Sequence, residues 1–199
     1  MTRALTAAAC ILATAAVLVA ASLVYARATR LSARPAPGGL ETRLARFVRR
    51  VALPDDVSRR LNPVPLSAAA LEDGMAHFAD HCGSCHGNDG SGATEMGQNL
   101  FPKAPDMRGA PTQDLSDGEL FWIIENGIRF TGMPGWGDGT PESTASTWNL
   151  VHFVRHLPRL SEDELARMEA MMPRSVDEVR EELEAERFLR GEDVPPAER

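Results

Sequence analysis

Cys82, Cys85 and His86 lie near the middle of the chain and have the types and spacing that attach a porphyrin. Two thiols three positions apart lie on one turn of a helix, where they reach the two vinyl groups of a single porphyrin. The next side chain, His86, is then expected to point at the iron. The run Cys82-Gly-Ser-Cys85-His86 therefore predicts a c-type haem attachment site.

Other uses of the cysteine pair stay open as alternatives. A zinc site needs a fourth ligand, which His77 or His81 offers, but no second Cys-x-x-Cys follows. His152 and His156 are spaced for one helix face, yet they lack a third ligand. A thioredoxin-type pair needs a nearby βαβ pattern, whose Val/Ile runs are absent. A disulfide over so short a loop would restrict the unfolded chain very little.

A haem iron held by one His needs a ligand on its opposite face. His and Met are the usual axial pair of cytochromes c, so a Met is expected downstream in a tight loop flanked by Gly or Pro. Met133 fits, because it stands in the run Thr-Gly-Met-Pro-Gly. Met96 and Met107 also lie in expected loops, but no Gly-x-Pro turn presents either. Met133 is the predicted second iron ligand, and Trp136 is expected to shield the same haem face.

Together these runs resemble a class I, monohaem cytochrome c over residues 68–157, about half the chain. The matching pieces are Cys82-Gly-Ser-Cys85-His86, Gly87-Asn-Asp-Gly-Ser-Gly92, Pro105-Asp-Met107 and Gly132-Met-Pro134. The resemblance implies an all-α domain around one covalent haem c, whose iron serves one-electron transfer in a respiratory chain. It implies an electron-transfer protein, not an enzyme in itself.

The resemblance also implies roles for residues between the two ligand motifs. In the family a proline offers its backbone carbonyl to the ring N–H of the iron-ligating His, which fixes the tautomer. Pro105 is the candidate, with Pro102 as the alternative, and Met107 is then expected to pack on the haem edge. Arg129 is a candidate partner for a haem propionate, because arginine binds carboxylates bidentately. A solvent-exposed Arg129 is the alternative.

Charge is segregated along the chain, whose formal net charge is −7. Residues 1–53 carry eight Arg and one Glu, whereas residues 54–158 carry six basic and fourteen acidic side chains. Residues 159–199 carry seven Arg and thirteen acidic residues. An acidic body disfavours nucleic acid and suits electrostatic steering toward a redox protein with a basic docking face. Plain solubility is the alternative explanation.

Residues 1–30 are predicted to anchor the chain, because residues 4–26 carry no charge and are long enough to span a bilayer as a helix. A signal cleaved after Ala26, which would release a soluble periplasmic protein, is the alternative. Only Arg3 precedes the span and three arginines follow it closely, so the positive-inside rule favours a cytoplasmic C-terminal side. In the resembling family haem is attached outside the inner membrane. We therefore expect an N-in, C-out bacterial inner-membrane protein with a periplasmic haem domain.

Pro/Gly signals and helical spacing divide the remaining chain into three parts. Residues 31–66 form a linker with a basic amphipathic helix at 40–51, whose apolar face packs either on an anionic membrane or on the haem domain. Residues 67–158 form the haem domain, with helices near 68–81, 116–126 and 144–157. Phe78 is expected to pack on the last of these, and Trp122 in the core. Residues 159–199 form an acidic tail with helices at 161–172 and 175–190 and a disordered end.

Two functional alternatives remain open at this stage. One is a haem subunit of a larger dehydrogenase or oxidase. The other is a haem-based sensor that binds a small molecule at the iron, which requires Met133 to be absent from the iron or displaceable. For the acidic tail, the alternatives are a partner-docking helix and a solvated arm folded along the body.

Overall fold

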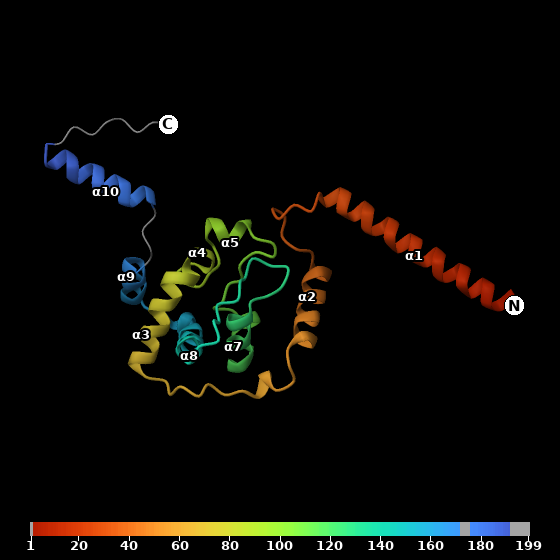
Figure 1. Ribbon diagram of the computed structural model, residues 1–199, viewed down its shortest axis with the longest axis horizontal. Helices are drawn as coiled ribbons and strands as arrows, with labels where there is room; N and C mark the ends of the chain where they lie inside the picture. Colours follow the sequence, from red (N-terminus) through yellow and green to blue (C-terminus); the bar gives the residue numbers. More distant parts are fainter. Residues whose placement is uncertain (1, 172–175, 192–199) are drawn as a thin grey trace.

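The computed structural model describes residues 2–171 and 176–191, which form helices and loops without a strand (Figure 1). This confirms the predicted all-α fold over the described residues. The elements in chain order are α1 (Thr2–Thr29), α2 (Gly39–Ala52), η1 (Val57–Arg59), α3 (Ala68–His77), η2 (Phe78–Cys82), α4 (Gly83–His86), α5 (Glu95–Asn99), α6 (Ala110–Gln113), α7 (Asp117–Asn126), α8 (Pro141–His156), η3 (Leu157–Arg159), α9 (Glu162–Met171) and α10 (Val176–Leu189).

The core of the helical body lies where α3 crosses α8. A Cβ on Gly74 would stand 2.3 Å from the carbonyl oxygen of Asn149, so the two backbones approach closely at this point. Next to the crossing, the rings of Phe78 and Phe153 pack with their centroids 5.2 Å apart. Both rings are buried, which confirms the expected contact between the first and last helices of the domain.

The α7 helix contributes a second aromatic pair, which differs from the expectation. The rings of Phe121 and Trp148 stack with a centroid separation of 4.1 Å, and both are buried. The expected core residue Trp122 is instead only partly buried and lies outside this cluster. Adjacent positions on a helix point about 100° apart, so only one of Phe121 and Trp122 can face α8.

Side-chain caps set the starts of the main helices. The hydroxyl of Ser67 accepts a hydrogen bond from the Ala70 amide, and Ser116 and Glu119 form a capping box at α7. The α8 helix begins three residues before the expected Thr144, since Thr140 caps it and Pro141 occupies its first turn. Proline suits that position because the amide it lacks would have no helical partner.

Two short helices were not expected from the sequence. α5 follows a capping Thr94 in a stretch assigned to loop, and α6 precedes α7. A helix of four or five residues is too short to show a hydrophobic period. Its stability depends on tertiary contacts rather than on its own sequence.

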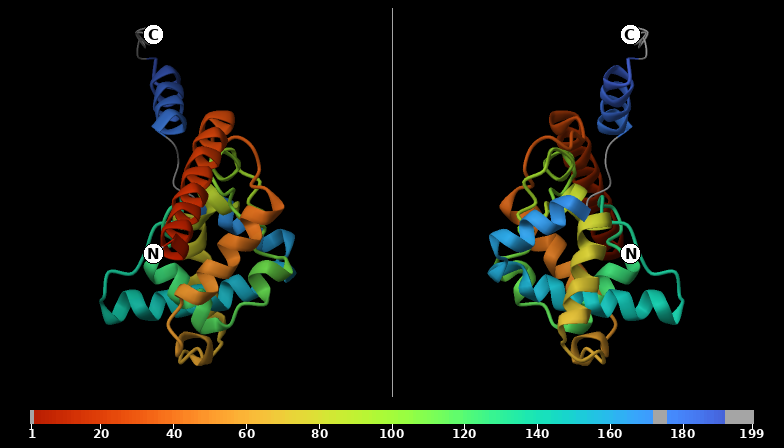
Figure 2. Two further views of the ribbon diagram at one scale, coloured as in Figure 1. Left: turned by 90° about the vertical axis from the view of Figure 1, so that its right-hand side faces the viewer. Right: turned by 90° about the vertical axis from the view of Figure 1, so that its left-hand side faces the viewer.

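The predicted acidic tail divides into two parts that behave differently. α9 joins the body: Met168 is fully buried, and Arg167 forms an ion pair with Glu72 of α3 at 2.8 Å. α10 extends beyond the body, and its Leu183 and Phe188 are exposed (Figures 1 and 2). The end predicted to be disordered begins at Gly191, and from residue 192 on it lies outside the described residues.

The N-terminal part projects from the other side of the body. α1 is long and apolar enough over Arg3–Thr29 to cross a membrane, a test that a signal sequence near an N-terminus also passes. α2 follows after a short linker and lies beside the body on the side where α1 projects (Figures 1 and 2). None of the residues of α2, all of which the structure describes, is buried.

Candidate haem site

The attachment motif lies at the end of the first domain helix. α3 continues through one π-helical turn, η2, directly into α4, so that Cys82 ends the turn and Cys85 and His86 lie in the next one. Both thiols are free, and Cys82 packs against the main hydrophobic cluster. Burial, with a smaller effect of Cys85, raises the pKa of Cys82 to about 12.

His86 carries a buried nitrogen that needs a partner. Its Nδ1 atom is buried and makes no well-formed hydrogen bond with any of the residues that the structure describes. Burial lowers the pKa of His86, while the backbone carbonyl of Pro105 beside the ring raises it. A buried N–H without an acceptor costs about 1–3 kcal/mol. A neutral imidazole beside the Pro105 carbonyl suits an iron ligand, and the effect of this carbonyl on the ring favours Pro105 over Pro102.

The loop after His86 wraps closely around the end of α4. The amide of Gly92 donates to the carbonyl of His86 at 2.7 Å, and the hydroxyl of Thr94 donates to the carbonyl of Cys85 at 2.9 Å. A Cβ on Gly97 would stand 2.1 Å from the Cys85 oxygen, so this close approach requires glycine. The loop thereby fixes the backbone of two of the three attachment residues.

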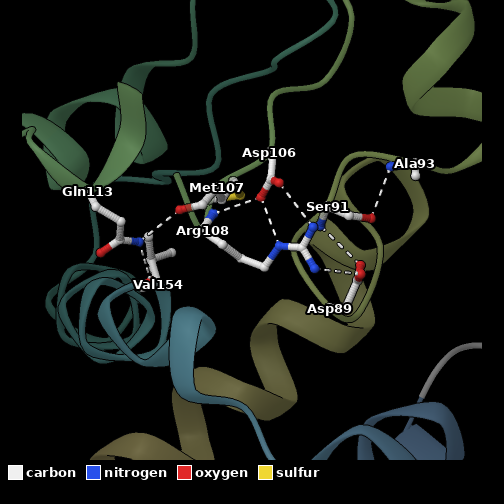
Figure 3. Close-up of polar contacts among 8 residues, drawn as sticks. All are labelled: Asp89, Ser91, Ala93, Asp106, Met107, Arg108, Gln113 and Val154. Atoms are coloured by element: carbon white, nitrogen blue, oxygen red, sulfur yellow. Dashed lines mark hydrogen bonds and ion pairs between the residues drawn. The ribbon is translucent and has the colours of Figure 1, made fainter. Parts of the chain in front are cut away.

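Arg108 ties this loop to the segment that contains Pro105, a role that the sequence did not predict (Figure 3). Its Nε and Nη2 donate to the two carboxylate oxygens of Asp106, each at 2.9 Å, and its Nη1 donates to Asp89 at 3.1 Å. The guanidinium of Arg108 lowers the pKa of Asp106. Asp89 also accepts the Ser91 amide at 3.0 Å. An Asp-x-Arg spacing was visible in the sequence, but nothing there pointed to Asp89.

Met107 is fixed from both sides in the same network. Its amide donates to the carbonyl of Gly90 at 2.8 Å, and its carbonyl accepts from the side chain of Gln113 at 2.8 Å. The same amide nitrogen of Gln113 donates to the carbonyl of Val154 in α8 at 2.9 Å (Figure 3). The side chain of Met107 packs against the hydrophobic cluster. The predicted contact of Met107 with a haem edge stays a prediction.

The loop that carries Met133 folds back on the end of α7. The Met133 amide donates to the hydroxyl of Thr131 at 3.1 Å, and its carbonyl accepts from the Ile128 amide at 3.1 Å. Gly127, with φ of +67°, ends α7 so close to the loop that a Cβ there would stand 2.7 Å from the Met133 oxygen. This arrangement holds the backbone of Met133 in one position.

Two contacts bring the Met133 loop to the attachment motif. The ring of Trp136 meets the ring of His81, next to Cys82, edge-on with centroids 5.1 Å apart. A Cβ on Gly132 would stand 2.6 Å from the side chain of Leu100, which follows α5. Trp136 and Cys82 also pack on the same hydrophobic cluster. Segments far apart in the sequence are thus placed around one region of the body.

The remaining candidate residues take no part in this arrangement. Arg129 is exposed, as is Phe130 beside it, whose side chain is 93% exposed. Three of the histidines weighed as metal ligands bond to separate parts of the body; the pairs are His77 with Ser146, His152 with the Val64 carbonyl and His156 with Glu164. No group of three or more His, Cys, Asp or Glu side chains disposed to hold a metal ion occurs within residues 2–171 and 176–191.

The fold and the paired motifs define a c-type cytochrome domain. Residues 69–154, which contain both ligand motifs, match the family described as cytochrome C oxidase, cbb3-type, subunit III. No curated protein sequence matches the chain. A domain of this kind binds haem c and serves haem-based electron transfer, which confirms the predicted resemblance to cytochromes c.

Proposed function

We propose that this chain is a membrane-anchored one-electron carrier with a single covalent haem, attached through Cys82 and Cys85 and ligated by His86 and Met133. The observation that carries the proposal is the convergence of the two motifs. Trp136 from the Met133 loop packs against His81, the residue that precedes Cys82. The family match covers both motifs and supports the same assignment.

Haem c, when bound, supplies an iron that alternates between two oxidation states. The side chains of His86 and Met133 would hold that iron, and Cys82 and Cys85 would hold the porphyrin. The Pro105 carbonyl orients the imidazole of His86, and the soft thioether of Met133 favours the reduced state and so raises the potential. If His86 and Met133 both bound the iron, they would leave no open position for a substrate, which would suit electron transfer rather than catalysis.

The proposed location is outside the cytoplasmic membrane, with α1 as the anchor. The length and apolar composition of α1 support a span, and covalent haem attachment in this family supports an external domain. The acidic body favours a redox partner with a basic docking face. Since the matched family is named for an oxidase subunit, an oxidase of the respiratory chain is the proposed kind of partner or complex.

A haem stain of denatured, gel-separated protein tests the covalent attachment, because thioether links survive denaturation. We expect the native chain to stain and the Cys82→Ser/Cys85→Ser variant to lose both the stain and most of its stable protein. Cys10→Ser is the matched control, since Cys10 lies in α1, and it is expected to stain normally. A colourless native chain would overturn the proposal.

Carbon monoxide added to the reduced protein separates electron transfer from small-ligand sensing. Two firm axial ligands leave no position for the gas, so the haem spectrum is expected to stay unchanged. Rapid formation of a carbon monoxide complex would instead assign the chain to the sensor class, with a displaceable Met133.

A further inference from the structure

α2 carries an apolar strip that the rest of the protein leaves uncovered. Its large apolar side chains are between 54% and 82% exposed; they are Leu40, Leu44, Phe47, Val48 and Val51. At 100° per residue they fall within an arc of about 100° on one side of the helix. A continuous exposed apolar strip of this kind on a single helix marks a site that binds a protein or a membrane.

The polar side of α2 faces the body. Arg49 projects about 155° from the middle of the apolar strip and is partly buried. Burial is the main cause that lowers its pKa, and the Glu119 carboxylate at the start of α7 acts in the opposite direction. Arg49 therefore lies close to α7. The apolar strip, on the opposite side of the helix and exposed, faces away from the helical body. α2 itself lies on the side of the body where α1 projects (Figures 1 and 2).

The charge around the strip complements an anionic surface. Arg43 and Arg50 flank one edge of the strip, with Arg46 beyond them. Glu41 is the single acidic residue between residues 27 and 53, against seven arginines in the same stretch. A second copy of this chain packed strip to strip would bring arginines against arginines. Anionic lipid presents both the apolar interior and the negative charge that this helix matches.

The position of α2 in the chain points to the same occupant. Only residues 30–38 separate the end of α1 from the start of α2. Nine residues span at most about 30 Å, so α2 starts close to the place where α1 would leave the bilayer. We infer that α2 lies flat on the anionic membrane surface, apolar strip inward, and holds the cytochrome body against the bilayer. This contact does not depend on whether α1 is later cleaved.

Protection of single cysteines tests this inference in the full-length holoprotein. The background is Cys10→Ser, and the haem cysteines are blocked as thioethers. Phe47→Cys places a thiol in the strip, and Ala45→Cys places one at an exposed position outside the strip on the same helix. The rate of reaction with a water-soluble maleimide is measured in phosphatidylcholine vesicles with and without phosphatidylglycerol. We expect phosphatidylglycerol to slow Phe47→Cys about tenfold and to leave Ala45→Cys within about twofold.

A charge variant identifies what protects the strip. Adding Arg43→Glu and Arg50→Glu to Phe47→Cys is expected to abolish the effect of phosphatidylglycerol, because the helix loses its attraction to anionic lipid. Arg159→Glu, an exposed site on the body, is the control and is expected to keep the effect. Equal reaction rates of Phe47→Cys in both lipids overturn the inference. So does protection that survives the charge reversal, which would indicate a protein surface over the strip.

Discussion

At the scale of single residues, the proposed ligands depend on backbone contacts as much as on their own types. Burial lowers the pKa of His86, so its imidazole is a poor general base. Beside the Pro105 carbonyl, the same imidazole is a suitable iron ligand. Met133 is held by hydrogen bonds of its own amide and carbonyl. Arg108 acts indirectly. Its ion pairs with Asp89 and Asp106 hold the segment that contains Pro105, and the Pro105 carbonyl lies beside His86.

Replacement of Met133 tests the second ligand. Met133→Ala removes a soft thioether, so we expect loss of the His/Met absorption near the red end of the spectrum. The potential should fall by on the order of 0.1 V, within the roughly 0.8 V range that axial ligands control. Visible spectra and a redox titration of the purified protein measure both effects.

Met96→Ala serves as the control, since Met96 is exposed, and it should leave spectrum and potential unchanged. Met107→Ala should also keep the red-end absorption, because Met107 is assigned to packing. If Met107→Ala removes that band and Met133→Ala does not, the assignment of the second ligand is wrong.

At the scale of elements, the site depends on how three helices meet. α3 leads directly into the attachment motif and crosses α8, while α7 presents the Met133 loop. α9 closes the other side of α3 through the buried Met168. The part of the predicted tail nearest the domain thus supports α3, the helix that leads into the proposed attachment residues.

Crowding at the α3–α8 crossing is expected to loosen this arrangement. A Cβ in Gly74→Ala would stand 2.3 Å from the Asn149 oxygen, which forces the helices apart. We expect a loss of about 1–3 kcal/mol in the free energy of unfolding. Denaturant titration of the holoprotein gives the value. Gly39→Ala, with nothing within 4 Å, should be neutral within about 0.5 kcal/mol, and equal behaviour of the two variants would refute the close crossing.

The attachment of α9 is expected to weaken in acid. The Ser161 amide, with smaller effects of its hydroxyl and of His156, holds the pKa of Glu164 below its usual value of 4.5, against the opposing effect of burial. A lowered folded pKa stabilises the protein above that value, and the contribution is lost as pH falls through the folded pKa.

Glu164→Gln should therefore be less stable than the native chain near neutral pH by about 1 kcal/mol, a typical value for a lost cap. Unfolding measured from neutral pH down to about pH 3 should show this difference disappear. Glu162→Gln removes a charge from the same first turn at an exposed site and is the control, expected to change stability little. A difference that persists at the acid end would exclude the ionised pair as its cause.

At the scale of the whole molecule, two helices on one side of the body set its relation to a membrane. α1 has the length of a span, and α2 exposes an apolar strip beside it. The arginines after α1 oppose an external body by the positive-inside rule, whereas the proposed covalent haem attachment favours one. If α2 binds lipid, the body is held at the bilayer, which suits exchange with partners in the same membrane.

A fusion of alkaline phosphatase to the C-terminus distinguishes the two orientations. We expect an active enzyme, because it folds only outside the cytoplasm and haem attachment requires an external domain. A fluorescent protein that matures only in the cytoplasm, fused at the same place, is expected to stay dark. An inactive phosphatase together with a bright fluorescent fusion would reverse the proposed topology.

The sequence by itself determined the chemistry that depends on short spacing. Cys82, Cys85 and His86 lie within little more than one turn on any helix. The caps at Ser67 and Ser116 depend on residues that are near in the sequence. The helices and the all-α class follow from the same local rules, apart from segments as short as α5. Covalent attachment could therefore be predicted without a structure.

Only the tertiary structure decided whether each helix face contacts the body or solvent. Periodicity identified the apolar face of α2, which is exposed, but it did not indicate that α9 buries Met168. The sequence predicted Trp122 in the core, whereas the structure places Phe121 there. Asp89, nineteen residues before Arg108, became its partner through a loop. The physical reason is that spacing fixes which side chains share a face, whereas the partner of that face depends on distant parts of the chain.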